Sequence, residues 1–287
     1  MKTCVSTYSF SQWMSKNNKT LFDAIDKTRE LGFDAIEFCI GDDLEGGRDT
    51  IVKLRDRCAE IGLPIASYTT GANFLVADPK AEVERMKENV DRAALLGAPC
   101  LRHDICWSFY EGYNGVKTFE AALGIMAPYI RELTEYAAQK GVKTMSENHG
   151  YFAQDADRIN ALINAVNHPN YGWLCDMGNF CCADEDSVTS VSKLAPLAMH
   201  VHAKDMFLRS GSGPNPGRGW GKTRGGNYFR GTIFGHGNTP TFQCLSILHN
   251  AGYNGYVSLE FEGIEDNIPA LEIGLENMRN YLAIIEG

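Results

Sequence analysis

The chain contains no apolar run that approaches the roughly 20 residues of a membrane-spanning helix. Residues 1–14 also lack the continuous apolar stretch and the small-residue cleavage site of a signal peptide. No C-x-x-C pair occurs, and the nine cysteines, an odd number, lie mostly in apolar segments, as Cys4, Cys39, Cys100 and Cys175 do. These absences predict a cytoplasmic protein whose thiols are reduced and buried.

Basic charge is also scarce, because the formal net charge is −9 and the sequence pI is about 5.3. Neither a nucleic acid nor an anionic membrane surface would be attracted to such a chain. Gly and Pro are scattered and form no linker, so we expect one domain over residues 1–287. A small neutral substrate is the partner that this composition favours.

Short apolar segments alternate with helical patterns eight times along the chain. Several helical patterns stop at a glycine, as at Gly32 and Gly97, and one begins with Pro79. The first expected strand, residues 4–9, is short and contains several polar residues, so it gives the weakest strand signal. The expected helices span residues 20–31, 48–61, 79–96, 118–140, 155–166, 187–194, 241–250 and 268–285.

Four apolar segments in the second half of the chain each end on a side chain that can bind a metal. These are Glu147 after KTMS, Asp176 after GWLC, His202 after AMHV and Glu260 after YVSL. Three carboxylates and one imidazole suit Mn²⁺, Mg²⁺, Co²⁺ or Zn²⁺. Such an ion can hold a hydroxyl and a carbonyl oxygen of a sugar while carboxylates transfer protons, so the pattern predicts an enzyme.

Eight strand–helix units fit either a closed barrel or an open doubly wound sheet. An open sheet would spread four neighbouring strand ends over roughly 15 Å, at about 4.8 Å per strand, which is too far for one ion. A closed barrel brings every carboxyl end of its strands to one face. We therefore predict an α/β fold that is a single (β/α)₈ barrel.

Residues 206–238, which follow the seventh expected strand, form the one long insertion without a helix or strand signal. Loops of this length are functional or disordered. Five basic side chains gather here with Trp220, Tyr228 and Phe229. We expect a lid, a subunit contact or both, with an exposed flexible flap as the alternative.

Several motifs make the chain resemble the sugar phosphate isomerase/epimerase superfamily, the xylose isomerase-like TIM barrels. They are GFDAIEF at 32–38, SENHG at 146–150, CDMGNF at 175–180, HAKD at 202–205, GHG at 235–237 and AGYNGYVSLEFEG at 251–263. The resemblance covers essentially the whole chain. It implies that Glu147, Asp176, His202 and Glu260 are metal ligands, with Mn²⁺ the first choice of metal, and that Glu147 and Glu260 form an acid/base couple.

Two departures from the ketose 3-epimerases bear on the reaction. Those enzymes place a substrate-binding His three residues after the Asp ligand, where this chain has Asn179, and their Arg after the His ligand has only Arg209 as an approximate counterpart. Asn148 and His149 after the Glu ligand resemble instead the inosose dehydratases and the C-glycoside-cleaving lyases. The expected function is therefore a metal-dependent sugar isomerase or epimerase acting through an enediolate, and the alternative is a lyase or dehydratase with His149 as base.

Each of several other polar residues near the strand ends can be interpreted in two ways. His149 could be a base or could orient a ligand, and Lys204 could steady an enolate or pair with Asp205. His103, beside Arg102, could bind hydroxyl groups or belong to a buried pair with a carboxylate such as Asp104. Further candidates for substrate contacts are Asn179, Arg209, His236 and Glu37, while His168, His200 and His249 are expected in core or surface roles.

The expected partners are a small carbohydrate, further copies of the chain in a homo-oligomer and, for a lyase, a small second subunit. We expect neither nucleic acid nor membrane as a partner. An apurinic endonuclease is disfavoured because the chain has one compact ligand set and no basic stripe outside residues 206–238. A non-enzymatic binding barrel remains a further alternative.

Overall fold

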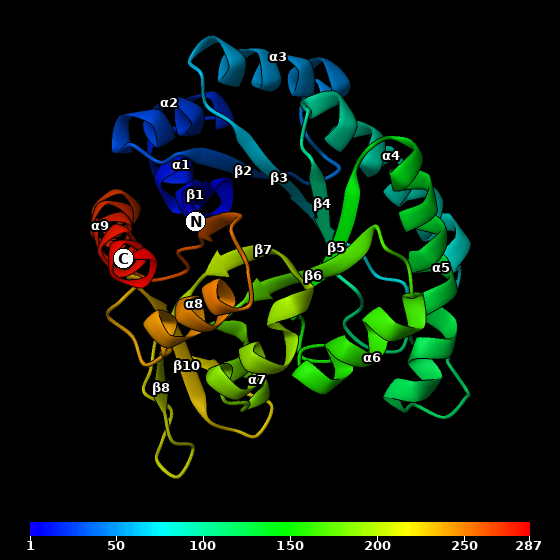
Figure 1. The fold of residues 1–287 in the computed structure, drawn as a ribbon. Helices are drawn as coiled ribbons and strands as arrows, with labels where there is room; N and C mark the ends of the chain where they lie inside the picture. The colour runs from blue at the N-terminus through cyan, green and yellow to red at the C-terminus, as the bar shows by residue number, and fades with distance from the viewer.

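Eight parallel strands form a closed barrel in the computed structural model, which describes residues 1–287 (Figure 1). Around the barrel the strands follow the order β1-β11-β7-β6-β5-β4-β3-β2. This arrangement confirms the predicted (β/α)₈ fold. The barrel strands are β1 (Lys2–Ser6), β2 (Ala35–Cys39), β3 (Ile65–Thr70), β4 (Cys100–His103), β5 (Lys143–Glu147), β6 (Tyr171–Asp176), β7 (Ala198–Ala203) and β11 (Tyr256–Leu259).

Helices surround the barrel and cover its outer face (Figure 1). Their boundaries follow local signals: Asp78 accepts a hydrogen bond from the N–H of Ala81 before α4, and Gly97 ends α4 with a φ of 81° that other residues rarely adopt. The helices between successive barrel strands and at the end are α2 (Leu21–Leu31), α3 (Gly47–Glu60), α4 (Pro79–Leu96), α5 (Phe119–Gln139), α6 (Ala156–Val166), α7 (Ser187–Leu194), α8 (Thr241–Asn250) and α9 (Asn267–Glu286).

The first strand is shorter than expected, because residues 7–10 form a 3₁₀ helix, η1 (Thr7–Phe10), and not the end of a strand. A short helix that the sequence did not reveal, α1 (Ser11–Asn17), follows it. Ser9 explains the turn: its hydroxyl donates to the carbonyl of Leu259 at 3.0 Å and accepts from the N–H of Phe261 at 2.9 Å. This polar residue therefore ties the first turn to the end of β11 across the barrel closure.

The main core lies between the barrel and the helices, where Trp173, Tyr68 and Phe38 are fully buried. All nine cysteines are free, and eight of them are buried, as expected. Cys39 is the exception because it ends β2 at the mouth of the barrel and is exposed.

Residues 206–238 are only partly irregular, which corrects the prediction made from their sequence. They contribute to a three-stranded antiparallel sheet of β8 (Asp205–Arg209), β10 (Tyr228–Thr232) and β9 (Gly221–Lys222), in that order. We call residues 205–232 the flap. It projects from the barrel at the lower left of Figure 1. Glycines and prolines between β8 and β9 obscure the strand pattern, and only pairing with β10 makes these strands regular.

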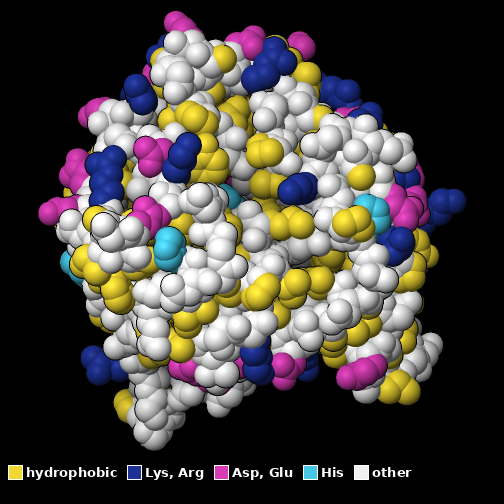
Figure 2. Space-filling view, viewed as in Figure 1, with side chains coloured by type: hydrophobic (Ala, Val, Ile, Leu, Met, Phe, Trp, Pro, Cys, Tyr) yellow, Lys and Arg dark blue, Asp and Glu magenta, His cyan; other side chains and the backbone are white.

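None of the helices combines the length and the hydropathy needed to cross a bilayer. On the face seen in Figure 2, Lys and Arg side chains are interspersed with Asp and Glu, and no extended basic stripe is visible.

Candidate metal centre and cavity

Four side chains meet at the carboxyl ends of neighbouring barrel strands. Glu147 ends β5, Asp176 ends β6, His202 lies in β7, and Glu260 directly follows β11. One potential ligand atom from each residue lies within 4.8 Å of the others, and all four residues form one buried cluster. The structure thus brings together the quartet that the strand-end pattern selects.

Three atoms of this cluster, Asp176 Oδ2, His202 Nδ1 and Glu260 Oε2, are buried and make no well-directed hydrogen bond, although Lys204 Nζ lies close to the two carboxylate oxygens. The imidazole nitrogen has no partner, and buried polar atoms are rarely left in this state. Two carboxylate oxygens and an imidazole nitrogen are suitable ligands for a divalent cation. The cluster therefore fits a metal ion, with Glu147 as the fourth ligand.

Neighbouring groups fix the orientation of Asp176. Its Oδ1 accepts the N–H groups of Gly178 at 2.8 Å and Asn179 at 3.0 Å, which leaves Oδ2 facing the cluster. The side chain of Asn148 accepts the N–H of Asp176 at 3.0 Å and donates to its carbonyl at 2.8 Å. Burial raises the pKa of Asp176 to about 7, although Lys204 opposes the shift. A bound cation would offset this penalty on the ionised form.

Glu37 orients His202 from below the cluster. One oxygen of Glu37 lies 2.8 Å from His202 Nε2, and the other lies 2.7 Å from His200 Nε2. A proton on Nε2 leaves the lone pair of His202 Nδ1 directed at the cluster, which is the arrangement of a metal-binding histidine. The potential ligand atoms of Glu37, His200 and His202 are also close enough to one another to hold a metal ion. Both oxygens of Glu37 already contact imidazole nitrogens, so the trio suits hydrogen bonds better.

Two cations pair with the carboxylates. Lys204 Nζ lies 2.6 Å from Glu260 Oε2 and 3.0 Å from Asp176 Oδ2, and Arg102 Nη2 lies 2.5 Å from Glu147 Oε2. Burial opposes the ionised form of Glu260, but Lys204 and His202 hold its pKa well below the usual range. Lys204 is not the partner of Asp205, which instead accepts backbone N–H groups around residues 235–239.

A cavity of about 240 Å³ opens above the cluster, large enough for a monosaccharide. His149 lines it, and its Nδ1 lies 2.8 Å from Asp104 Oδ1. Asp104 also pairs with Arg102 at 2.8 Å. Burial disfavours the protonated form of His149, but Asp104 and Glu147 raise its pKa overall. The lining consists of Tyr8, Cys39, Thr69, Thr70, Gly71, Arg102, Asp104, Glu147, His149, Lys204, Glu260 and Glu262.

Asn179 and His103 do not line this cavity. Asn179 is buried and donates to Glu147 Oε1 at 2.7 Å, so it holds a ligand. His103 is fully buried on the helix side of the barrel wall. Its ring packs edge-on against Phe74 and stacks on Tyr171. Successive residues of a strand point to opposite faces, so Arg102 faces the cavity and His103 cannot.

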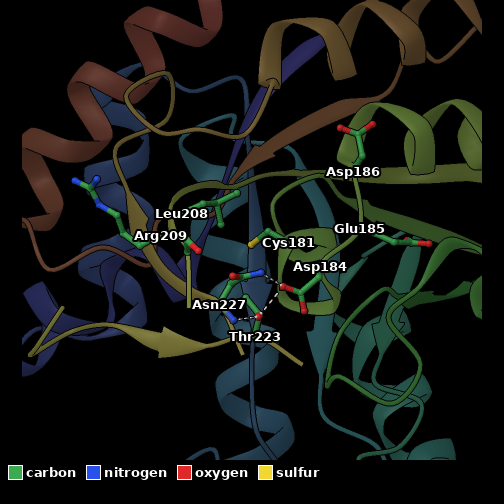
Figure 3. Close-up of a pocket in the computed structure, with 9 residues that line it drawn as sticks. Cys181, Asp184, Glu185, Asp186, Leu208, Arg209, Thr223 and Asn227 are labelled. Atoms are coloured by element: carbon green, nitrogen blue, oxygen red, sulfur yellow. Dashed lines mark hydrogen bonds between the residues drawn. The ribbon is translucent and has the colours of Figure 1, made fainter. Parts of the chain in front are cut away.

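Arg209 and His236 also lie outside the cavity. Arg209 ends β8 on the exposed flap, next to a different pocket that Asp184 and Asn227 help to form (Figure 3). His236 is exposed in the loop after β10, where its N–H donates to the carbonyl of Ile233. Neither residue is placed to contact a molecule bound at the cluster.

Sequence reasoning missed Tyr8, Thr70 and Glu262 as cavity residues. Tyr8 lies in η1, which was expected as strand, and its hydroxyl is 3.4 Å from Glu262 Oε1. Thr70 ends β3, so the strand-end rule that selected the metal-capable residues would have selected it too. Glu262 lies two residues after Glu260, on the same side of an extended chain, and its Oε2 is 3.3 Å from Lys204 Nζ.

A closed barrel of eight parallel strands with surrounding helices is a TIM barrel. Residues 25–281 match the family described as xylose isomerase-like TIM barrel, and the chain belongs to this family. No functionally curated protein matches the sequence.

Solved structures with the same fold include enzymes of different reaction classes. D-psicose 3-epimerase from Clostridium cellulolyticum H10, with D-tagatose, is 17% identical, with 98% of this chain and 99% of that chain covered and a TM-score of 0.75. A probable 3-DHS dehydratase, AsbF from Bacillus anthracis, is 18% identical, with 98% and 99% covered and a TM-score of 0.75. A family member from Mycobacterium smegmatis in complex with magnesium is 19% identical, with 93% and 89% covered and a TM-score of 0.68. At these identities the likeness establishes the fold and leaves the reaction open.

Proposed function

We propose that the protein is a divalent-metal-dependent isomerase or epimerase that acts on a sugar or keto-sugar by proton transfer through an enediolate. The observation that carries this proposal is the convergence of buried ligand atoms from Glu147, Asp176, His202 and Glu260 beside a polar cavity. A divalent ion held there would polarise a carbonyl group and make the adjacent C–H more acidic. Mn²⁺ is our first choice, and the magnesium complex of a structural neighbour supports a divalent ion in general.

Glu147 and Glu260 would move the proton. Glu147 ends β5 and Glu260 follows β11, and β6 and β7 separate these strands around the barrel, so the two carboxylates approach a bound molecule from different directions. Arg102 at 2.5 Å and Lys204 at 2.6 Å pair with the two carboxylates and fix their positions. One carboxylate can therefore take a proton from carbon while the other returns one, as an epimerisation or isomerisation requires.

The charges around the cavity favour a substrate without a phosphate. Five carboxylates, those of Asp104, Glu147, Asp176, Glu260 and Glu262, face only two fixed cations, Arg102 and Lys204. A divalent ion leaves a small negative excess, which would repel an anionic substrate. The basic residues of the flap do not line this cavity.

Solvent exchange tests the proposal. The Mn²⁺-loaded protein is incubated in D₂O with a panel of ketoses and 3-keto-glycosides, and the recovered sugars are analysed by mass spectrometry. We expect one deuterium at the carbon next to the carbonyl of the true substrate. Glu260→Gln should abolish uptake, whereas the exposed control Glu30→Gln should not affect it. Absence of label from the whole panel would rule the proposal out.

A second function is favoured by the pair of His149 and Asp104. An imidazole that is oriented by a carboxylate at 2.8 Å and lines the cavity suits the base of a β-elimination, which would make the protein a lyase or dehydratase. The similarity of the fold to that of a probable dehydratase supports this candidate. His149→Ala should then stop elimination from a 3-keto-glycoside without weakening metal binding by calorimetry. Unchanged turnover would exclude this role.

A further inference from the structure

The flap is docked on the barrel loops by its turn, residues 223–227. Asp184, after β6, accepts hydrogen bonds from Thr223 Oγ1 at 2.7 Å and Asn227 Nδ2 at 2.8 Å (Figure 3). Its other oxygen accepts the N–H of Gly225 at 2.5 Å. The N–H of Arg224, in the middle of the turn, donates to the carbonyl of Cys182 at 2.8 Å. These hydrogen bonds join the turn to the barrel loops.

The side chain of Arg224 reaches from this turn to the loop after β5. Its guanidinium donates to both oxygens of Asp155, at 2.6 and 3.0 Å, and to the carbonyl of Tyr151. In the opposite direction, the hydroxyl of Tyr151 donates a hydrogen bond to the carbonyl of Lys222, in the flap, at 3.0 Å. These bonds tie the flap turn to the segment that directly follows His149.

That segment has an unusual backbone. Gly150 and Tyr151 both have positive φ, at 83° and 62°, and the second is a bulky residue for which this conformation is unfavourable. A Cβ on Gly150 would lie 3.1 Å from the Trp107 ring, which itself packs edge-on against His149. Such a loop keeps its shape only while outside contacts hold it, and Arg224 supplies the contact to the Tyr151 carbonyl.

We propose that Arg224 is a positioning residue that holds His149 at the cavity by clamping the Gly150–Tyr151 turn. This proposal rests on the proposed function insofar as His149 takes part in turnover. Without the guanidinium, the turn relaxes toward ordinary backbone angles and the imidazole moves relative to the cavity. Displacements of about 1 Å in such a group lower the rate by up to about 100-fold.

The first test compares three variants in the turnover assays described above. Arg224→Ala should lower kcat by about 10- to 100-fold, with KM and the Mn²⁺ affinity from calorimetry within about twofold, because the substrate and metal contacts are untouched. Arg224→Lys, which can still reach the Tyr151 carbonyl, should recover part of kcat. Arg218→Ala, on the exposed part of the same flap, is the matched control and should behave like the parent protein.

A double-mutant cycle and hydrogen exchange distinguish failure of the Arg224 proposal from failure of the proposed role of His149. Arg224→Ala should have no further effect in the His149→Ala background, and an undiminished effect there would overturn the proposal. The backbone amides of residues 150–153 should exchange faster in Arg224→Ala, and unchanged protection would also overturn it. If exchange accelerates while His149→Ala keeps full activity, the clamp exists and the catalytic role of His149 is what fails.

Discussion

Glu37 is the residue on which the geometry of the nitrogen ligand depends. It is fully buried, and its two oxygens contact the imidazoles of His200 and His202 at 2.7 and 2.8 Å. A carboxylate can accept a hydrogen bond on each oxygen, whereas an amide has only one accepting oxygen. Burial opposes ionisation of Glu37, but His202 and His200 hold its pKa well below the usual value. The contacts therefore fix His202 with Nδ1 free to bind a metal.

Replacing Glu37 by Gln should weaken metal binding. The amide keeps the shape of the side chain but turns one of the two accepting positions into a donor, so His202 loses its fixed orientation. We expect the Mn²⁺ affinity measured by calorimetry to fall by roughly 10- to 100-fold, as for other carboxylates behind metal-binding histidines. Glu30→Gln, the same change on the exposed end of α2, is the control. An affinity equal to that of the parent would contradict the orienting role.

The metal-capable quartet could be predicted from the sequence, whereas the role of Glu37 could not. Glu147, Asp176 and Glu260 stand out because each terminates a run of apolar residues. Glu37 has the same local pattern, and the sequence suggested a packed carboxylate or a substrate contact for it. Its actual partners are 163 and 165 residues away and belong to β7, on the far side of β1 and β11. Only the closed barrel brings them together.

At the scale of elements, Asn148 joins the ends of β5 and β6. It is fully buried, and its amide makes hydrogen bonds with the indole of Trp173 and with both the N–H and the carbonyl of Asp176. These bonds fix the position of Asp176, at the end of β6, relative to Glu147, at the end of β5. The side chain next to the first metal-capable residue thus positions the second.

Asn148→Ala should destabilise the protein and loosen the cluster. Three buried hydrogen bonds are lost at about 1 kcal/mol each, so the free energy of unfolding should fall by about 3 kcal/mol in urea titrations. Asn164→Ala, at an exposed position on α6, is the control and should change stability by less than about 0.5 kcal/mol. Equal stability of the two variants would show that Asn148 does not join the strands.

The flap depends on Asp184 in a similar way, because this carboxylate accepts three hydrogen bonds from the turn at residues 223–227. Asp184→Ala should release the turn, so that the backbone around the basic residues of the flap unfolds locally and becomes a better substrate for trypsin. We expect cleavage within residues 209–230 at least tenfold faster than in the parent at equal global stability. Asp157→Ala on α6 is the control, and cleavage rates equal in both variants would contradict the docking contact.

Helices were easier to predict than the flap. The bounds of α4, α7 and α8 agree with the sequence because capping residues, proline and glycine act within one or two turns. The pairing of β8 with β10 depends instead on residues 19 to 27 positions apart, with glycine-rich segments between them. The predicted end of the first strand was wrong for a related reason. The hydrogen bonds of Ser9 connect this segment to Leu259 and Phe261, at the other end of the chain.

At the scale of the whole molecule, the barrel joins the two ends of the chain. β1 pairs with both β2 and β11, so the strand with the weakest sequence signal closes the structure. The metal-capable cluster then spans β5, β6, β7 and β11, and Glu37 on β2 reaches it from across the closure. A cation bound at the cluster would connect four neighbouring strands, β5, β6, β7 and β11, and its effect should extend to global stability.

Metal binding should therefore raise the unfolding temperature. The cluster does not exist in the unfolded chain, so an ion at 100 times its Kd should stabilise the protein by about 2.7 kcal/mol. For a chain of this length that corresponds to an increase in Tm of about 5 °C, measurable by calorimetry with Mn²⁺ added and then removed by a chelator. Asp176→Asn should bind the ion weakly and lose most of this increase, because Oδ1 can still accept the N–H groups of Gly178 and Asn179 while the amide group no longer supplies a charged ligand. An equal rise in Tm for this variant would place the ion elsewhere and remove the basis of the proposed chemistry.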